Sequence, residues 1–222
     1  MLDKDTIKSI ENLLEKDLDK EMDLIKNELF YFLDKDLDMF FLKEFIKHYP
    51  VKLLRERSEV LLDTVLNYLM KEVLESIRKQ TSDIQYAFAR ENLREKVKNW
   101  ALTKENRYNP DILRLKEEET FVEKTITVAP GVAVSAGGLI AVASVPETLI
   151  LKAIPAVSTL AGPIYIFKKI KEKNRRLKNI WKKEINNYLE KSKKEIKVWL
   201  KKVIEKFEKE LGEFYQKNKI EA

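Results

Sequence analysis

The fold is decided by residues 168–212, KKIKEKNRRLKNIWKKEINNYLEKSKKEIKVWLKKVIEKFEKELG. This stretch contains no Pro, and its only Gly is its last residue. A helix of this length would extend about 65 to 70 Å, which predicts a stalk-like element rather than part of a compact domain. Apolar residues recur at helical spacing and are expected on one face: Leu177, Trp181, Ile185, Leu189, Ile196, Leu200, Val203, Phe207 and Leu211.

The beginning of this stretch is strongly basic. Residues 168–183 hold nine Lys or Arg and a single acid, Glu172. Such a cluster can contact anionic lipid headgroups, at about 1 kcal/mol per charge. Because Trp181, Tyr188 and Trp199 fall on the apolar face of the helix, a nucleic-acid partner is disfavoured. The predicted headgroup contacts are Lys168, Lys169, Lys171, Lys173, Arg175, Arg176 and Lys178.

The preceding segment, residues 126–167, is almost uncharged. It has two charges, Glu147 and Lys152, and contains four of the six Pro and four of the five Gly in the chain. Residues 146–148 join two apolar arms, each of which could cross a hydrocarbon core of about 30 Å as a helix. We predict a helical hairpin that spans a bilayer or dips into one leaflet. The predicted inserting residues are Val128, Val132, Leu139, Ile140, Val142, Leu149, Ile150, Leu151, Ile154, Ile164, Ile166 and Phe167.

Small residues are spaced along the first arm so that they would share one face of a helix. Ala129, Ala133, Gly137 and Ala141 follow one another at intervals of four and are predicted to let the second arm pack closely. One alternative stays open, in which the hairpin is the buried core of a soluble helical interaction module. Either a bilayer or protein must cover the aliphatic side chains, since each gains about 1.5 to 3 kcal/mol on burial.

Residues 1–125 are predicted to form charged amphipathic helices. The first would end at Pro50, whose ring cannot continue the hydrogen-bond ladder. A second is expected over residues 51–77, followed by a break at residues 81–83. Helical periodicity then resumes over residues 84–100, and a further helix is expected over residues 111–122. The apolar face of the first helix would hold Ile7, Ile10, Leu14, Leu18, Met22, Ile25, Leu29, Leu33, Leu37 and Phe40.

Composition limits the chemistry of the chain. Its 222 residues are 36% charged and include no Cys and one His, so cysteine-based and multi-histidine metal sites are excluded. No phosphate-binding loop, dinucleotide fingerprint or zinc-protease motif occurs. Glu44 and His48 lie four residues apart and are expected to form a surface ion pair. We predict a protein without catalytic activity or a cofactor.

The predicted fold is all-α, with an antiparallel bundle or stalk of long helices and a central apolar helical hairpin. The predicted domains are a helical bundle at 1–125, the membrane-interacting hairpin at 126–167, and a long basic helix at 168–222 that packs back on the bundle. Charge supports this division, because residues 1–48 carry a net −5 and residues 168–222 a net +10. Basic residues beside the hairpin favour membrane association with both termini cytoplasmic, and an anionic bilayer as the partner.

The order of these segments resembles the stalk and membrane paddle of bacterial dynamin-like proteins. The likeness is carried by residues 128–167 and by AGPIYIFKKIKEKNRR, residues 161–176, where a paddle would pass into a basic stalk. It implies that the hairpin dips into a bilayer, that residues 168–183 contact headgroups, and that the long helices form a lever and a self-assembly surface. The family's GTPase domain is absent from this sequence, so the resemblance implies a homo-oligomer or a separate GTPase chain as a partner. A second resemblance is to α-helical pore-forming proteins, whose amphipathic helices shield an apolar hairpin until it inserts.

Overall fold

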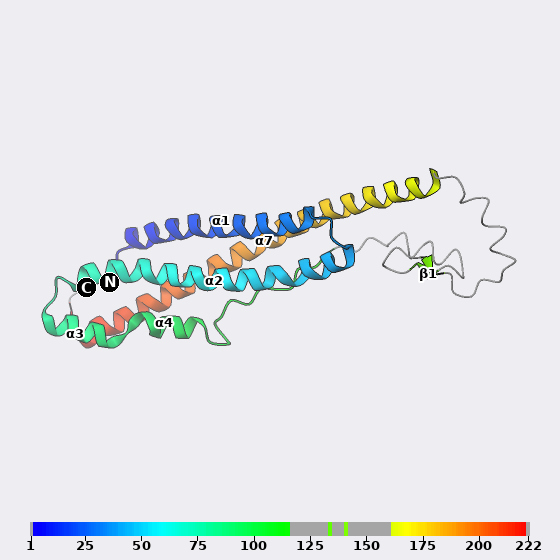
Figure 1. Ribbon diagram of the computed structural model, residues 1–222. Coiled ribbons are helices and arrows are strands. Elements are labelled where there is room, and N and C mark those ends of the chain that lie inside the picture. The colour runs from blue at the N-terminus through cyan, green and yellow to red at the C-terminus, as the bar shows by residue number, and fades with distance from the viewer. Residues whose placement is uncertain (1, 116–132, 135–139, 142–160, 221–222) are drawn as a thin grey trace. The chain divides into compact units, whose positions relative to one another are not determined.

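The computed structural model describes residues 2–115, 133–134, 140–141 and 161–220. Helices dominate the described residues, as predicted (Figure 1). The elements are α1 (Lys4–Asp34), α2 (Met39–Ile77), α3 (Ser82–Glu91), α4 (Leu93–Ala101), β1 (Ala133–Val134), β2 (Ile140–Ala141) and α7 (Ala161–Lys217).

The chain divides into two compact units. Unit 1 comprises Met1–Arg114 together with Lys183–Ala222, and unit 2 comprises Leu115–Lys182. The helix α7 therefore belongs to both. The apolar segment 126–167 and most of the basic stretch fall in unit 2, whereas the apolar face of α7 that the sequence predicts falls mainly in unit 1.

The first helix has the predicted face but a different end. Asp3 caps α1 by accepting a hydrogen bond from the Thr6 amide at 2.6 Å. The helix stops at Asp34, so the prediction of an end at Pro50 was wrong. Seven of the predicted face residues are buried: Ile10, Leu14, Leu18, Met22, Ile25, Leu29 and Leu33.

The reason for this early end lies in the acidic turn before α2. The carboxylate of Asp38 accepts hydrogen bonds from the amides of Phe40 and Phe41, at 3.0 and 2.9 Å, and so caps a new helix. Pro50 lies inside α2 and is buried. It removes one ladder hydrogen bond, and burial beside Leu53 and Leu54 offsets that loss.

The predicted break after α2 is confirmed, since α3 begins at Ser82 with Thr81 in the N-cap position. A second break was not predicted. Asn92 adopts a left-handed conformation, with φ at 48°, and separates α3 from α4. Asn tolerates this region better than most residues because its short polar side chain can bond locally.

The helix predicted over residues 111–122 is wrong at its described residues, because residues 111–115 are not helical. Side chains of α7 bond to this segment instead. The Trp199 indole N–H donates to the Asn106 carbonyl at 2.7 Å, and the Tyr188 hydroxyl donates to the Asp111 carbonyl at 2.6 Å. The Asp111 carboxylate accepts from Lys191 at 2.8 Å and so does not cap a helix. The remainder of the predicted helix lies outside the described residues.

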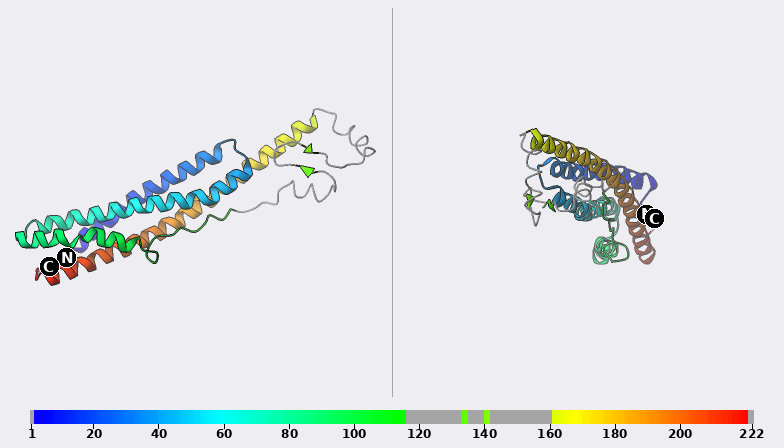
Figure 2. Two further views of the ribbon diagram at one scale, coloured as in Figure 1. Left: turned by 60° about the horizontal axis from the view of Figure 1, so that its bottom comes forward. Right: turned by 90° about the vertical axis from the view of Figure 1, so that its right-hand side faces the viewer.

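The helix α7 has 57 residues, longer than the predicted one. Eight of its nine predicted apolar residues are buried: Trp181, Ile185, Leu189, Ile196, Leu200, Val203, Phe207 and Leu211. Within unit 1 it runs opposite to α1, because Lys193 pairs with Asp19, Lys197 with Glu15 and Lys201 with Glu11. Figure 2 shows the start of α1 and the end of α7 close together, away from the α1–α2 connection.

The first apolar arm differs from its predicted form at four described residues. β1 and β2 pair antiparallel, with Ala133 opposite Ala141 and Val134 opposite Ile140. A helix through these positions was therefore the wrong prediction, and Ala133 and Ala141 do not share a helical stripe. The sequence offers a physical reason, because Val and Ile favour strands, and Gly137 and Gly138 each disfavour a helix by about 1 kcal/mol relative to Ala. Ala129 and Gly137 lie outside the described residues.

Candidate functional site

The predicted membrane-inserting residues fall into three groups. Val128, Val132, Leu139, Val142, Leu149, Ile150, Leu151 and Ile154 lie outside the described residues. Ile140 lies in β2, and Ile164, Ile166 and Phe167 belong to the first turns of α7. Of the helices within the described residues, none has an apolar stretch long enough to cross a membrane.

All seven predicted headgroup contacts lie on α7, so their backbone is helical. Lys171, Arg175 and Arg176 are exposed, whereas Lys173 and Lys178 are half-buried and engaged in interactions. Lys171 and Arg175 are four residues apart and therefore lie on one side of the helix, and Arg176 lies about 100° further around it. Among the described residues, no ion pair joins any of these three exposed cations to an acid. They form an open basic surface, which we call the basic patch.

A cluster of aromatic rings lies where α1 ends and α2 begins. Phe45 contacts Phe32, Phe41 and Tyr49, with ring centroids 4.7, 6.1 and 4.4 Å apart, and Tyr31 meets Phe32 edge-on. Three residues of this region are strongly exposed: Tyr31 at 57%, Phe40 at 74% and Phe41 at 57%. We call these three residues the aromatic end.

The aromatic end was not predicted as a functional surface. The sequence signal that could have indicated it is the density of aromatics on both sides of the acidic turn at Asp34–Asp38. That signal does not distinguish buried rings from exposed rings, because the sequence does not show which face of α1 or α2 a neighbouring helix covers. Leu29 and Leu33 on α1 are fully buried, whereas Tyr31, between them, is exposed.

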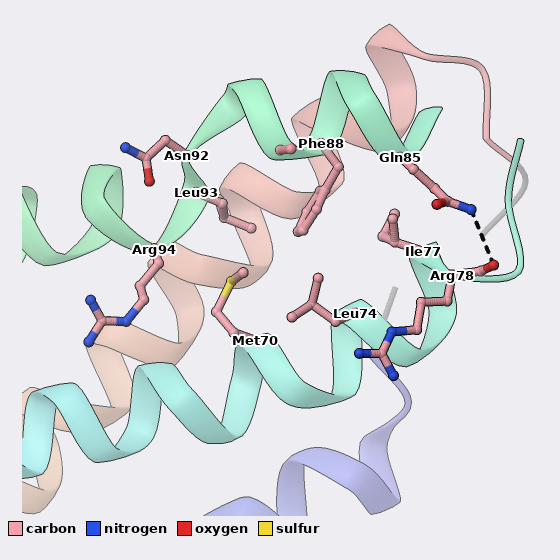
Figure 3. A pocket seen from close by; sticks show the side chains of 10 residues that line it. Met70, Leu74, Ile77, Arg78, Gln85, Phe88, Asn92, Leu93 and Arg94 are labelled. Atoms are coloured by element: carbon pink, nitrogen blue, oxygen red, sulfur yellow. Dashed lines mark hydrogen bonds between the residues drawn. The ribbon is translucent and has the colours of Figure 1, made fainter. Parts of the chain in front are cut away.

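A hollow of about 310 Å³ lies between α2, α3 and α4 (Figure 3). Apolar side chains line most of it, among them Met70, Leu74, Phe88 and Leu93. Arg94, at one end, contacts Asp63 at 2.6 Å and Glu95 at 2.9 Å. Arg94 is thus already used to hold α4 against α2, and the other polar residues that line the hollow are Arg78, Gln85 and Asn92.

Two buried tyrosines lie on or against α7. Burial raises the pKa of Tyr108 to about 12, and burial also raises the pKa of Tyr188 well above its ordinary value. Both phenols stay neutral near pH 7, and the Tyr188 hydroxyl donates a hydrogen bond to the Asp111 carbonyl, whereas the buried Tyr108 hydroxyl has no hydrogen-bond partner among the described residues. Glu44 and His48 approach within 3.9 Å on an accessible surface of α2, as predicted. Within the described part of the chain, no three His, Cys, Asp or Glu side chains gather closely enough to hold a metal ion.

Comparisons with known proteins leave the family open. No protein-family model, curated protein or solved structure matches this chain. The likeness to dynamin-like and pore-forming proteins therefore stays a prediction that rests on the order of the segments.

Proposed function

We propose that this chain is a non-catalytic, membrane-associated helical protein. Its apolar segment, residues 126–167, would enter a bilayer and thereby anchor, remodel or permeabilise it, while the basic patch contacts anionic headgroups. The observation that carries the proposal is that unit 1 buries the apolar faces of its own helices, while the apolar segment is assigned to unit 2.

Packing within unit 1 supports this proposal over the soluble alternative. That alternative needs the apolar segment as the core around which the amphipathic helices wrap. In unit 1 the helices instead contact one another. Phe88 of α3 meets Phe214 of α7 with ring centroids 5.3 Å apart, and Leu14 and Leu18 of α1 face Ile204 of α7 across a small hollow. Unit 1 therefore has apolar packing that does not draw on residues 126–167.

Tyrosine contacts between α1 and α2 point the same way. The Tyr68 hydroxyl donates to the Asp17 carboxylate at 2.8 Å, and the Tyr49 hydroxyl donates to Glu28. These bonds fix α1 against α2 along much of their length. An α1 that had to open around an apolar core would lose them, so the packing of unit 1 favours a different cover for the apolar segment.

Insertion of apolar side chains and adsorption of cations at the membrane surface differ in energy, and this difference makes the proposal testable. Each aliphatic side chain that enters a bilayer contributes about 1.5 to 3 kcal/mol, whereas each cation near an anionic surface contributes about 1 kcal/mol. Salt screens the second contribution and leaves the first almost intact. Insertion should therefore withstand high salt, and surface adsorption should not.

The proposal is tested by flotation of the full chain with neutral and with anionic liposomes, followed by washes in high salt and then in alkaline carbonate. We expect part of the protein to stay bound through both washes. If high salt alone releases the protein, it is bound only by adsorption of charged residues to the surface, and insertion of the apolar segment is contradicted. A monodisperse helical protein that does not float with either liposome would contradict the proposal and favour the soluble alternative.

A matched pair of variants identifies the segment responsible. Val132→Asp with Leu139→Asp places two charges in the apolar segment and should abolish carbonate-resistant binding while circular dichroism retains the helical signal. The control is Val60→Asp with Val198→Asp, the same kind of change at positions in unit 1 that are 50% and 56% exposed. The control should bind like the parent chain. If the first variant instead loses its fold, the apolar segment is a protein core.

A further inference from the structure

Both places where the chain passes between the units lie at the same end of unit 1. The ion pairs between α1 and α7 fix the direction, since Lys201 pairs with Glu11 and Lys193 with Asp19. Continuing this register brings Lys183, the first residue of α7 in unit 1, beside Leu29 in the last turns of α1. The chain thus re-enters unit 1 near the α1–α2 connection.

The other crossing lies close to it. Asp111 is held by the Tyr188 hydroxyl and the Lys191 ammonium of α7, at 2.6 and 2.8 Å, and unit 1 ends three residues later at Arg114. Tyr188 lies five residues beyond Lys183 on the same helix. The exit and the re-entry are therefore neighbours, and both lie toward the end of unit 1 where α1 meets α2, away from the end where α1 begins and α7 stops (Figure 2).

The aromatic end occupies this same α1–α2 connection. Leu13, Leu24 and Val60, which are also exposed on unit 1, are spaced singly along helices, as is common on protein surfaces. Tyr31, Phe40 and Phe41 instead gather around one turn. Lys35 places its ammonium 4.3 Å from the centre of the Tyr31 ring. Rings of this kind with a flexible cation beside them suit the boundary between lipid headgroups and acyl chains.

The charges around the turn help to choose among occupants. Residues 34–43 carry three acids, Asp34, Asp36 and Asp38, and two lysines, Lys35 and Lys43. These charges nearly cancel, so they neither attract nor strongly repel an anionic surface. A contact made by the rings themselves, with a bilayer whose surface charge matters little, fits this balance.

We propose that Tyr31, Phe40 and Phe41 form a second membrane contact, in which their rings enter the headgroup region and hold unit 1 end-on to the bilayer. This inference rests on the proposed function, because entry of the apolar segment is what would bring this end of unit 1 to the lipid. Unlike the basic patch, the aromatic end should contact neutral and anionic bilayers alike.

The absence of Cys from the chain allows a direct test with single-cysteine variants that carry an environment-sensitive fluorophore. Asp36→Cys labels the exposed turn before α2 and keeps all three rings. Thr81→Cys labels the exposed turn after α2 and is the matched control, since the Thr81 side chain makes no capping hydrogen bond. Leu139→Cys reports on the apolar segment. Each is mixed with phosphatidylcholine vesicles, with and without phosphatidylserine, and with vesicles that carry a nitroxide quencher in the acyl chains.

We expect the labels at positions 36 and 139 to shift to the blue and to be quenched on both kinds of vesicle, and the label at position 81 to stay unchanged. Adding Tyr31→Ser, Phe40→Ser and Phe41→Ser should abolish the response at position 36 and keep that at position 139. Phe40→Ser alone, at the most exposed of the three residues, should weaken it at least severalfold and serves if the triple variant loses its helical signal.

The alternative outcomes separate the two proposals. A response at position 139 without one at position 36 overturns this inference and leaves the proposed function in place. Silence at both positions contradicts the proposed function, and the inference with it. A response at position 36 that appears without vesicles and grows with protein concentration overturns the inference in favour of contact with a second copy of the chain.

Discussion

Two stretches of α7 carry similar residues in different surroundings. Over residues 191–201, Lys193, Lys197 and Lys201 each pair with an acid of α1. Over residues 168–178, the cations of the basic patch are exposed, and among the described residues no ion pair joins them to an acid. The net +10 of residues 168–222 is therefore not a single patch. Part of it pairs with acids of α1, whereas the basic patch beside the apolar segment is exposed.

The largest expected effect separates the two stretches by their packing. Phe207 is fully buried in unit 1, so Phe207→Ala should lower the free energy of unfolding by about 3 to 5 kcal/mol. Ile170, beside the basic patch, is 47% exposed, and Ile170→Ala should change it by no more than about 0.5 kcal/mol. Urea unfolding followed by circular dichroism measures both. Equal losses would mean that the basic stretch is also packed as a core.

If Phe207→Ala does not fold, Ile185→Val measures the same contrast on a smaller scale. Ile185 is fully buried, and removal of one methyl group there should cost about 0.5 to 1.5 kcal/mol.

The next effect concerns binding and follows from the proposed function. Lys171→Gln, Arg175→Gln and Arg176→Gln together should weaken binding to anionic vesicles roughly 100-fold at low salt, because each cation contributes about 1 kcal/mol near the surface. Stability should not change. The control removes the same number of charges from exposed positions of α7 in unit 1, with Lys194→Gln, Lys202→Gln and Lys209→Gln. Equal losses from both variants would show that α7 binds by its overall charge and that the basic patch is not special.

Much of the helical framework could be predicted because it depends on local periodicity. The buried faces of α1 and α7 follow the spacing of apolar residues, and the break at Thr81 follows a capping signal. The failures have tertiary causes. Pro50 is accommodated inside α2. The carbonyl of Asp111 accepts a hydrogen bond from Tyr188, and its carboxylate accepts one from Lys191. These hydrogen-bond partners lie 77 and 80 residues away from Asp111 in the sequence, so a local sequence pattern does not reveal them.

The candidate site divides in the same way. The basic patch could be predicted, because clustered charges beside an apolar segment are visible in the sequence. The sequence does not predict which of those cations are exposed. Lys173 and Lys178 differ from Arg175 and Arg176 only in the direction in which each side chain leaves the helix. The aromatic end depends on which face of α1 and α2 is left uncovered, and only the packed structure gives that.

A smaller effect tests how unit 1 holds a buried charge on α7. Glu210 is 6% exposed and receives contacts from Lys206 and Lys96, each at 2.5 Å. Burial alone would raise the pKa of its carboxyl, but hydrogen bonds from the two lysines outweigh burial and hold the pKa below its ordinary value. Glu210→Gln should cost about 1 to 3 kcal/mol at pH 7, because hydrogen bonds to a charged group are lost. Glu205→Gln, at an exposed position of the same helix, should cost little.

The sign of the pH dependence follows from the lowered pKa. A carboxyl with a lower pKa in the folded state stabilises the fold above its unfolded pKa, and this contribution is lost as the pH falls through the folded value. The stability difference between the parent chain and Glu210→Gln should therefore shrink as the pH falls below about 4.3, the ordinary Glu value. A difference that is unchanged at low pH would show that the amide fails for reasons of shape.

The smallest expected effect tests whether the ion pairs that orient α7 on α1 also stabilise it. Lys197 and Glu15 lie 2.9 Å apart on a partly accessible surface, and such pairs contribute about 0.2 to 1 kcal/mol. Lys197→Gln, Glu15→Gln and the double variant form a thermodynamic cycle that isolates the pair. Its coupling energy should fall close to zero in 1 M salt, where the screening length is about 3 Å.

Exchanging the two charges, with Lys197→Glu and Glu15→Lys, distinguishes a pairwise attraction from a packing effect of the side chains. An attraction should be largely restored by the exchange, whereas a packing effect should not. The pair Lys52 and Glu56, four residues apart on α2 and 3.8 Å apart in space, provides the comparison within a single helix. If the α1–α7 pair couples no more strongly than that one, the apolar face of α7 orients it on α1 and the ion pairs follow from the packing.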